Sequence, residues 1–253
     1  MSAPVLILHD GATGALVRLL QDRMGAPSPS LCASSVKAWQ AAHGLAADGA
    51  VGPNTLRSFG LVAELGVDVN GAKGPVNWPR VAAFGVEHVS LKCSEGLTFN
   101  DPRFLTNIIA AQAVELQVRA YHYARPNNNV DLEARHALQC AGAVPLDLDL
   151  ETTGDLSPSA LGAWSLKFLQ IVAAAQGEAQ YLYLNEDFWL HRLDQYARDA
   201  IADQFRLWIA APGRAQPQPS FPHFEAHQFS WVGEVPGIAG NVDMDWIISS
   251  CGV

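Results

Sequence analysis

The sequence predicts an α/β protein: a (β/α)-type barrel with an incomplete outer ring of helices, preceded by a small domain of three helices. Two observations predict the barrel. From residue 65 onward β-prone runs alternate with helical runs, the order typical of a parallel sheet, and about 190 residues hold eight strand candidates. A third observation concerns the helices. The last three strand candidates are joined by loops too short for full helices, so we expect gaps in the outer ring.

The first part of the chain, residues 1–62, is expected to form three short helices. Leucines at helical spacing place one helix over 16–20. A second helix begins at Val36 and ends at Gly44, which is suited to a C-cap. A third helix covers 53–59 and begins with proline, the residue preferred at a first helical position.

Two motifs in this first part match a known pattern, in which a "V..LQ" helix is followed by "V..fQ...gL..DG.vGp.T". The matching stretches are VRLLQ at 17–21 and VKAWQAAHGLAADGAVGPNT at 36–55. This part therefore resembles the small peptidoglycan-binding domain of cell-wall hydrolases, which implies a wall-binding module. The segment before the second helix departs from the pattern, because it carries prolines and no "fG..T". Much of the motif consists of turn glycines and core residues, so it singles out no sugar-contacting side chain.

The second part, residues 65–253, is expected to hold the barrel. Its strands are predicted at 65–70, 87–94, 118–124, 145–151, 179–185, 206–210, 224–230 and 241–247. Its helices are predicted at 77–84, 102–115, 130–141 and 158–176, with shorter ones near 186–202. The helix over 158–176 has the clearest start, because Ser157 can cap it and Pro158 suits its first position.

Three acids occupy every second position of the fourth predicted strand: Asp147, Asp149 and Glu151, separated by leucines. Alternate residues of a strand share one face, so the acids are stacked on one side and the leucines on the other. Stacked like charges repel, and an ordinary buried strand has no reason to carry them. A glycosidase has a reason, because it needs two carboxyl groups at the scissile bond. For Asp147, the deepest of the three, we favour a buried salt bridge with Lys92 over a catalytic role.

Other polar side chains lie where predicted strands end. In βα barrels the reactive groups collect at the carboxyl ends of the strands. Asp68 ends the first strand, Tyr183 lies near the end of the fifth, and Asp243 lies in the last. Tyr121 and Tyr123 of the third strand are expected to face inward, where core packing and substrate contact are equally good interpretations.

A series of motifs runs in order through this second part. They are GVDVN at 66–70, VNWPRV at 76–81, VSLKCSEG at 89–96, DPRFLTN at 101–107, AYHYA at 120–124, DLE at 149–151, HQFS at 227–230, GEVPGI at 233–238 and NVDMD at 241–245. Together they resemble the lysozymes of glycoside hydrolase family 25, which are common among phage endolysins. The resemblance implies a muramidase that cleaves the β-1,4 bond between N-acetylmuramic acid and N-acetylglucosamine of peptidoglycan.

The resemblance also implies roles for the acids. Glu151 becomes the general acid, and repulsion from nearby Asp149 is expected to raise its pKa. Asp149 stabilises positive charge at the reacting centre or orients the acetamido group of the substrate, and Asp68 and Asp243 complete an acidic ring. Two routes stay open: the N-acetyl group as internal nucleophile, or a carboxylate that activates water. We favour the first, because Asp149 and Glu151 are two residues apart on one strand.

The same resemblance adds candidate substrate contacts. Tyr121, Tyr123, Tyr183 and Gln228 are the first of them. Lys92 and Glu95 match the pattern of the second strand, and for each an ion pair is as good an interpretation as substrate binding. Two rival functions stay open, a non-catalytic wall-binding protein and a glucosaminidase. An amidase would need a zinc set or a Cys/His pair that we cannot assemble from this sequence.

Composition excludes several other classes. The net charge is −9, residues 1–64 are electrically balanced, and no basic patch suggests nucleic acid. No apolar run approaches the roughly 20 residues of a membrane span. The four cysteines form no metal-type CxxC pair and are expected to be buried free thiols. We expect a monomer without metal or other cofactor. The N-terminus lacks a standard signal peptide, which suggests synthesis in the host cytoplasm and phage-lysin-like action on the wall.

Overall fold

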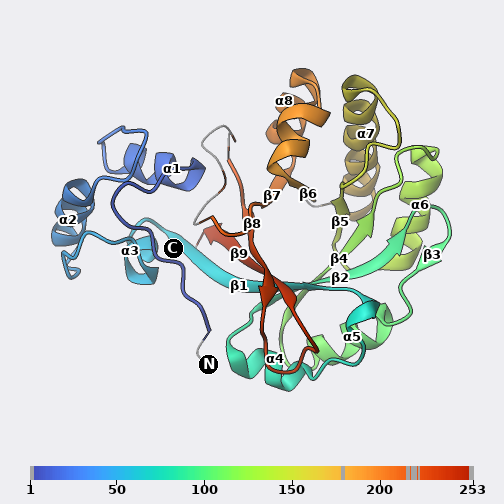
Figure 1. The fold of residues 1–253 in the computed structure, drawn as a ribbon, viewed down its shortest axis with the longest axis horizontal. Helices are drawn as coiled ribbons and strands as arrows, with labels where there is room; N and C mark the ends of the chain where they lie inside the picture. Colours follow the sequence, from blue (N-terminus) through green and yellow to red (C-terminus); the bar gives the residue numbers. More distant parts are fainter. Residues whose placement is uncertain (1–2, 178–179, 215–216, 218–220, 222, 251–253) are drawn as a thin grey trace.

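A computed structural model describes residues 3–177, 180–214, 217, 221 and 223–250. Its sheet has the strand order β1-β9-β8-β7-β6-β5-β4-β2-β3, and β1 also pairs with β2. Eight strands thus close into a barrel, while the short β3 lies outside it next to β2 (Figure 1). The predicted fold class is confirmed.

All eight predicted strands are present. Their bounds are β1 Leu61–Val69, β2 His88–Glu95, β4 Gln117–Tyr123, β5 Leu146–Asp149, β6 Tyr181–Asn185, β7 Arg206–Ala210, β8 Ala226–Gly233 and β9 Val242–Ser250, with β3 at Phe99–Asn100. The first strand begins at Leu61, before the predicted start of the barrel at residue 65, because its early residues pair with the end of β9. β5 ends at Asp149, so Glu151 lies just beyond the strand rather than on it.

The last strand corrects the expectation of a parallel sheet. β9 runs antiparallel to both β8 and β1, whereas the other neighbouring strands of the barrel are parallel. A parallel connection needs a dozen or more residues, and the segment between Gly233 and Val242 is too short for one. The amino end of β9 therefore lies beside the carboxyl ends of the parallel strands. This reversal pairs Asp243 directly with Asp68.

The helices of the barrel follow the prediction closely. They are α4 Trp78–Phe84, α5 Phe104–Gln112, α6 Val130–Ala141, α7 Pro158–Gln176 and α8 Gln195–Gln204, with a 3₁₀ turn η1 at Gly71–Lys73 and a π-helical turn η2 at Phe188–Arg192. The Ser157 hydroxyl accepts a hydrogen bond from the Ala160 amide, and left-handed Gly177 ends α7. Among the described residues no helix separates β7, β8 and β9, so the outer ring is incomplete as expected.

The N-terminal part contains the three predicted helices: α1 Ala15–Arg23, α2 Ala33–Ala42 and α3 Pro53–Ser58. They lie on the opposite side of the barrel from α6 and α7, and α3 leads directly into β1 (Figure 1). Buried Gln40 organises this part, because its amide bonds the Asp48 carboxylate, the Ala50 carbonyl and the Thr55 hydroxyl. Trp39 stacks between His43 and Phe59, at ring distances of 4.0 and 4.2 Å.

Two other expectations are tested by the fold. No helix in the described ranges is both long and apolar enough to cross a bilayer. The cysteine prediction is only partly right: Cys93 is buried, whereas Cys32 and Cys140 are partly exposed because they lie at the start of α2 and near the end of α6. Cys251 lies outside the described residues.

Candidate active site

The carboxyl ends of the parallel strands surround a pocket of about 180 Å³. Eight of the ten predicted site residues line it, and Asn70 and Trp208 complete the lining. The eight are Asp68, Lys92, Tyr121, Tyr123, Asp149, Glu151, Tyr183 and Asp243. Seven of them lie on six strands that are distant in sequence, and Glu151 follows one of these, β5, so closure of the barrel brings them together.

Asp149 and Glu151 differ in their surroundings. Asp149 lies on β5 between Tyr123 and Tyr183 and is 6% exposed. Its Oδ1 is buried and has no hydrogen-bond partner within the described residues, which is uncommon for a buried polar atom. Burial, reinforced by the Glu151 charge, raises the pKa of Asp149 well above its usual range. Glu151 is exposed at the mouth of the pocket.

The effect of Asp149 on Glu151 is opposite to the expected one. Partial desolvation is the main cause that raises the pKa of Glu151, and the Asp243 charge adds to it. The hydrogen bond from Asp149 lowers the pKa of Glu151 instead of raising it. Burial raises the pKa of Asp149 well above its usual range, and the pKa of Glu151 is raised less, so Asp149 is the harder group of the pair to ionise.

Asp68 is held by a side-chain network behind the pocket. Gln228 donates a 2.8 Å hydrogen bond to Asp68 Oδ2 and accepts a 3.0 Å bond from the Tyr183 hydroxyl. Burial, followed by the charges of Asp245 and Asp243, raises the pKa of Asp68 well above its usual range. Gln228 is 3% exposed and does not line the pocket. Its expected substrate contact is therefore replaced by a contact with Asp68, because the side chain points at its neighbours inside the barrel.

Lys92 and Glu95 form the ion pair that the sequence left as one of two interpretations. Lys92 Nζ lies 2.6 Å from Glu95 Oε2 and 4.8 Å from the centre of the Tyr123 ring. Arg125 binds the other oxygen of Glu95 at 2.5 Å. Lys92 lines the pocket, whereas Glu95 does not. Glu95 thus positions two cations beside the Tyr123 ring.

Asp147 forms the predicted buried salt bridge, but its partner is Arg119 and not Lys92. The two carboxylate oxygens accept bonds of 2.7 Å each from Arg119 Nε and Nη2, and the Tyr181 amide adds a third bond. The register decides the partner. Asp147 pairs with Tyr121, whose neighbour on the same face of β4, one step deeper, is Arg119, whereas Lys92 lies toward the carboxyl end with Glu95.

A family model described as "Glycosyl hydrolases family 25" matches residues 67–238. The chain belongs to this family. The match runs from within β1 to beyond the end of β8 and leaves out β9.

Relatives and solved structures agree with this assignment. An autolytic lysozyme of Clostridium acetobutylicum is 29% identical over 71% of the chain and 54% of its own length. Lysozyme M1 of Streptomyces globisporus is 27% identical over 70% of the chain and 65% of its own length. The chain thus spans about half to two thirds of these relatives. A bacterial lysozyme from Streptomyces coelicolor has a similar structure, with a TM-score of 0.68, 26% identity, and coverage of 73% and 91% of the two chains.

Asp245 was left unassigned by the sequence, and in this family 25 barrel it lies directly beneath the acidic ring. It is 1% exposed, accepts a 2.8 Å hydrogen bond from Trp208 Nε1, and is paired with Gly66 of the neighbouring strand β1. A Cβ at Gly66 would lie 3.3 Å from the Asp245 Cβ, so the glycine makes room for this carboxyl. Asp243 and Asp245 are two residues apart on one strand and therefore share a face, and this spacing could have identified Asp245 from the sequence.

Replacing Asp245 by asparagine is expected to stabilise the protein at alkaline pH. Burial is the main cause that raises the pKa of Asp245 from 3.8 to about 8. Between these values the folded chain keeps a proton that the unfolded chain has lost, so wild-type stability falls as pH rises through this window. Asparagine can still accept the Trp208 bond and has no charge to bury. We expect no gain near pH 4 and a gain of about 2–5 kcal/mol above pH 8, measured by urea unfolding across the range. A gain that does not depend on pH would contradict this cause.

Among the described residues, no group of three or more His, Cys, Asp or Glu side chains is arranged so that it could hold a metal ion. The His122 side chain is fully buried. Its ring nitrogens bond the Ser94 hydroxyl at 2.8 Å and the Glu133 carboxylate at 3.0 Å. The groups available for chemistry at the pocket are therefore carboxyl groups, phenols and one ammonium group.

Proposed function

We propose that this family 25 chain is a muramidase that hydrolyses the β-1,4 bond between N-acetylmuramic acid and N-acetylglucosamine. The observation that carries the proposal is the pair of Asp149 and Glu151 at one strand end, one buried and one at the pocket mouth. The names of the related lysozymes support the same reaction class.

In the proposed mechanism Glu151 protonates the glycosidic oxygen as the bond to the leaving sugar breaks. Asp149 orients the acetamido group, whose carbonyl oxygen attacks the anomeric carbon. Water then opens the resulting oxazolinium ring, and Glu151 accepts the proton of that water. Both carboxyl groups lie at the end of one strand, which favours this substrate-assisted route over attack by water activated from the opposite face.

The new reducing ends test this proposal against its alternatives. Purified peptidoglycan is digested, reduced with borohydride and analysed by mass spectrometry. Reduced N-acetylmuramic acid is the expected product. Reduced N-acetylglucosamine would identify a glucosaminidase, and no new reducing end would favour a wall-binding protein or an amidase.

We also propose that residues 1–62 bind peptidoglycan and hold the barrel near its polymeric substrate. The motif match supports this role, and so does a groove of about 360 Å³ in this part, whose lining includes His9, Leu45 and Asn54. The Glu151→Gln chain is expected to sediment with insoluble peptidoglycan. Leu45→Asp should lower the bound fraction several-fold, whereas Leu105→Asp on the exposed face of α5 should not. Equal losses in both variants would argue against this groove.

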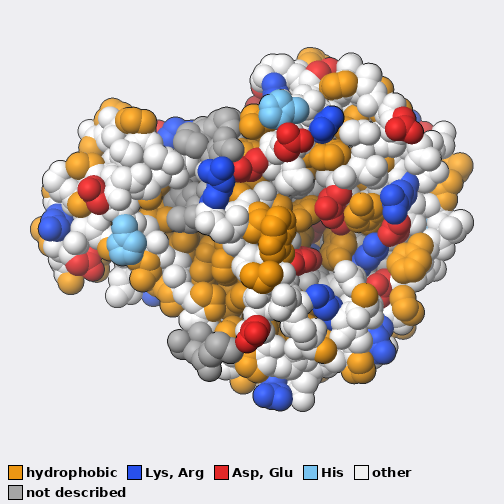
Figure 2. All heavy atoms as spheres, viewed as in Figure 1, with side chains coloured by type: hydrophobic (Ala, Val, Ile, Leu, Met, Phe, Trp, Pro, Cys, Tyr) orange, Lys and Arg blue, Asp and Glu red, His pale blue; other side chains and the backbone are white. Residues whose placement is uncertain are grey.

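We propose that the protein is a monomer of the phage-lysin type. Its similarity to the CTP1L endolysin supports the phage-lysin type, with a TM-score of 0.62, 27% identity, and coverage of 73% and 66% of the two chains. On the face in Figure 2 the described Lys and Arg side chains are scattered among acidic ones, which fits a substrate other than nucleic acid. Light scattering at 27.2 kDa, the mass of one chain, would support a monomer.

A further inference from the structure

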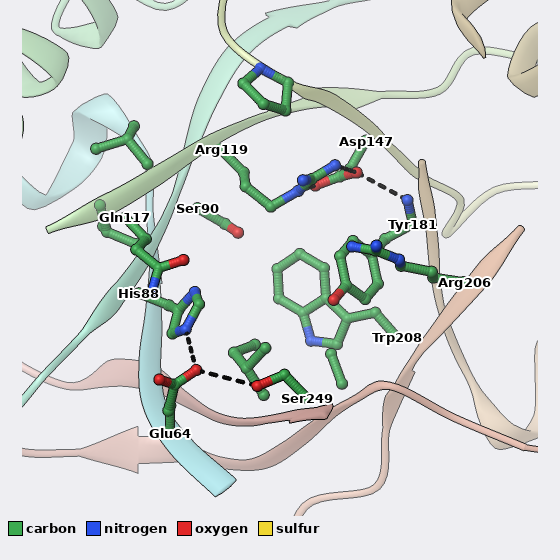
Figure 3. Close-up of a pocket in the computed structure, with 15 residues that line it drawn as sticks. Glu64, His88, Ser90, Gln117, Arg119, Asp147, Tyr181, Arg206, Trp208 and Ser249 are labelled. Atoms are coloured by element: carbon green, nitrogen blue, oxygen red, sulfur yellow. Dashed lines mark hydrogen bonds and ion pairs between the residues drawn. The ribbon is translucent and has the colours of Figure 1, made fainter. Parts of the chain in front are cut away.

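A second pocket, of about 370 Å³, opens at the opposite end of the barrel from the acidic ring. It lies among the amino ends of the parallel strands, where β2, β4, β6 and β7 begin with His88, Gln117, Tyr181 and Arg206. Figure 3 shows these side chains around a common space. Trp208 is the one described residue that borders both pockets. The second pocket is thus separate from the proposed catalytic site.

The interior of this end is polar and hollow. Small barrels are usually filled by layers of branched apolar side chains, and stability alone would be served by such a layer here. Instead the wall carries Ser90, Arg119, Asp147 and Ser249. Tyr181, Trp208 and Ala226 form a small apolar cluster that is separate from the main core. A cavity with an aromatic wall and a few polar groups is the usual form of a small-molecule site.

The charges of the pocket leave one cation available. Arg119 is held by Asp147 through two bonds of 2.7 Å, and Glu64 bonds His88 at 2.7 Å. Arg206 forms no ion pair with any residue of the described ranges, and its guanidinium lies 5.5 Å from the centre of the Tyr181 ring. The Glu64 carboxylate is bonded to His88 and to the Ser249 hydroxyl.

The aromatic wall is positioned for a ring. Tyr181 and Trp208 are 6% and 4% exposed, so their orientations are set by packing rather than by solvent. Arg119 lies 5.0 Å from the Tyr181 ring centre, so this ring has two guanidinium groups close to it. Ligand atoms that pack on Tyr181 would therefore lie within reach of Arg206.

We propose that this pocket binds a small organic anion of monosaccharide size, whose carboxylate or phosphate pairs with Arg206 and whose ring packs against Tyr181 and Trp208. The guanidinium fork matches both anions, so the shared chemistry is a planar or tetrahedral oxyanion on a ring. The site is independent of the proposed hydrolytic reaction.

Calorimetric titration of the full chain with glucuronate, glucose 6-phosphate and glucose tests this proposal. At least one charged sugar should bind roughly tenfold more tightly than glucose, because a charge-assisted bond is added. The tighter of the two charged sugars identifies a carboxylate or a phosphate as the natural group. Equal affinity for all three sugars, or no binding of any at millimolar concentration, would overturn the proposal and leave a structural polar network.

Two variants locate the binding. Arg206→Gln should lower the affinity for the charged sugar roughly tenfold, and Arg206→Lys should retain part of that affinity. Lys92→Gln is the matched control, because Lys92 is the cation that lines the catalytic pocket. This variant should bind the charged sugar with the wild-type affinity. Loss of binding in Lys92→Gln alone would place the ligand in the catalytic pocket instead. Arg206→Gln should keep its peptidoglycan hydrolysis, which separates this test from that of the proposed reaction.

Discussion

Glu151→Gln is expected to lower the rate of peptidoglycan hydrolysis by about three orders of magnitude, the middle of the range for general acid catalysis. The amide has nearly the shape of the carboxyl group but cannot transfer a proton to the leaving oxygen. Because Glu151 is exposed at the pocket mouth, the free energy of unfolding should change by no more than about 0.5 kcal/mol. Release of reducing ends and urea unfolding measure the two quantities.

Glu87→Gln is the matched control for this variant. Glu87 is an exposed glutamate just before β2, at the other end of the barrel from Glu151. The Glu87→Gln variant should hydrolyse peptidoglycan at the wild-type rate. If Glu151→Gln kept more than a tenth of the activity, another group would have to be the acid, and buried Asp149 would become the first candidate.

Asp147→Ala is expected to have the opposite phenotype, although Asp147 and Asp149 share one face of the same strand. Asp147 is 1% exposed and accepts two bonds from Arg119 and one from the Tyr181 amide. Its removal leaves a guanidinium and an amide without their acceptor, which costs about 3 kcal/mol. We take the lower end of the range for broken buried pairs because Arg119 is 18% exposed. Urea unfolding measures the loss.

A double variant shows whether the loss comes from the broken pair. Replacing Asp147 by leucine and Arg119 by methionine removes both charges, so the double variant should be more stable than Asp147→Ala. Folded Asp147→Ala should hydrolyse peptidoglycan within about threefold of the wild-type rate, since Asp147 lies below the pocket. A variant that stays stable but loses activity would place Asp147 in the catalytic machinery.

Local sequence patterns were sufficient for most elements of the fold. Helix α7 was predicted to the residue, and its predicted start rested on a serine cap and a first-position proline. The strand pattern and the resemblance to family 25 together identified eight residues of the pocket lining. Asp149 and Glu151 were found by their period of two, which is a property of any strand.

Other features depended on which strands became neighbours. The reversal of β9 placed Asp243 beside Asp68. The short segment before β9 is compatible with this reversal, but the periodicity of the strand does not show which residue pairs with Asp68. Gln228 faces Asp68 across a separation of 160 residues, so no local signal shows that contact.

The sequence by itself thus determined the barrel class, the places of its helices and strands, and which face of each strand carries acids. The tertiary structure alone decided how deep each acid lies and which side chain it contacts: Arg119 for Asp147, Trp208 for Asp245, and Gln228 for Asp68. The physical reason is that periodicity fixes only the direction of a side chain. Its depth, its solvation and the charge of its neighbours follow from the register between strands that are far apart in the chain.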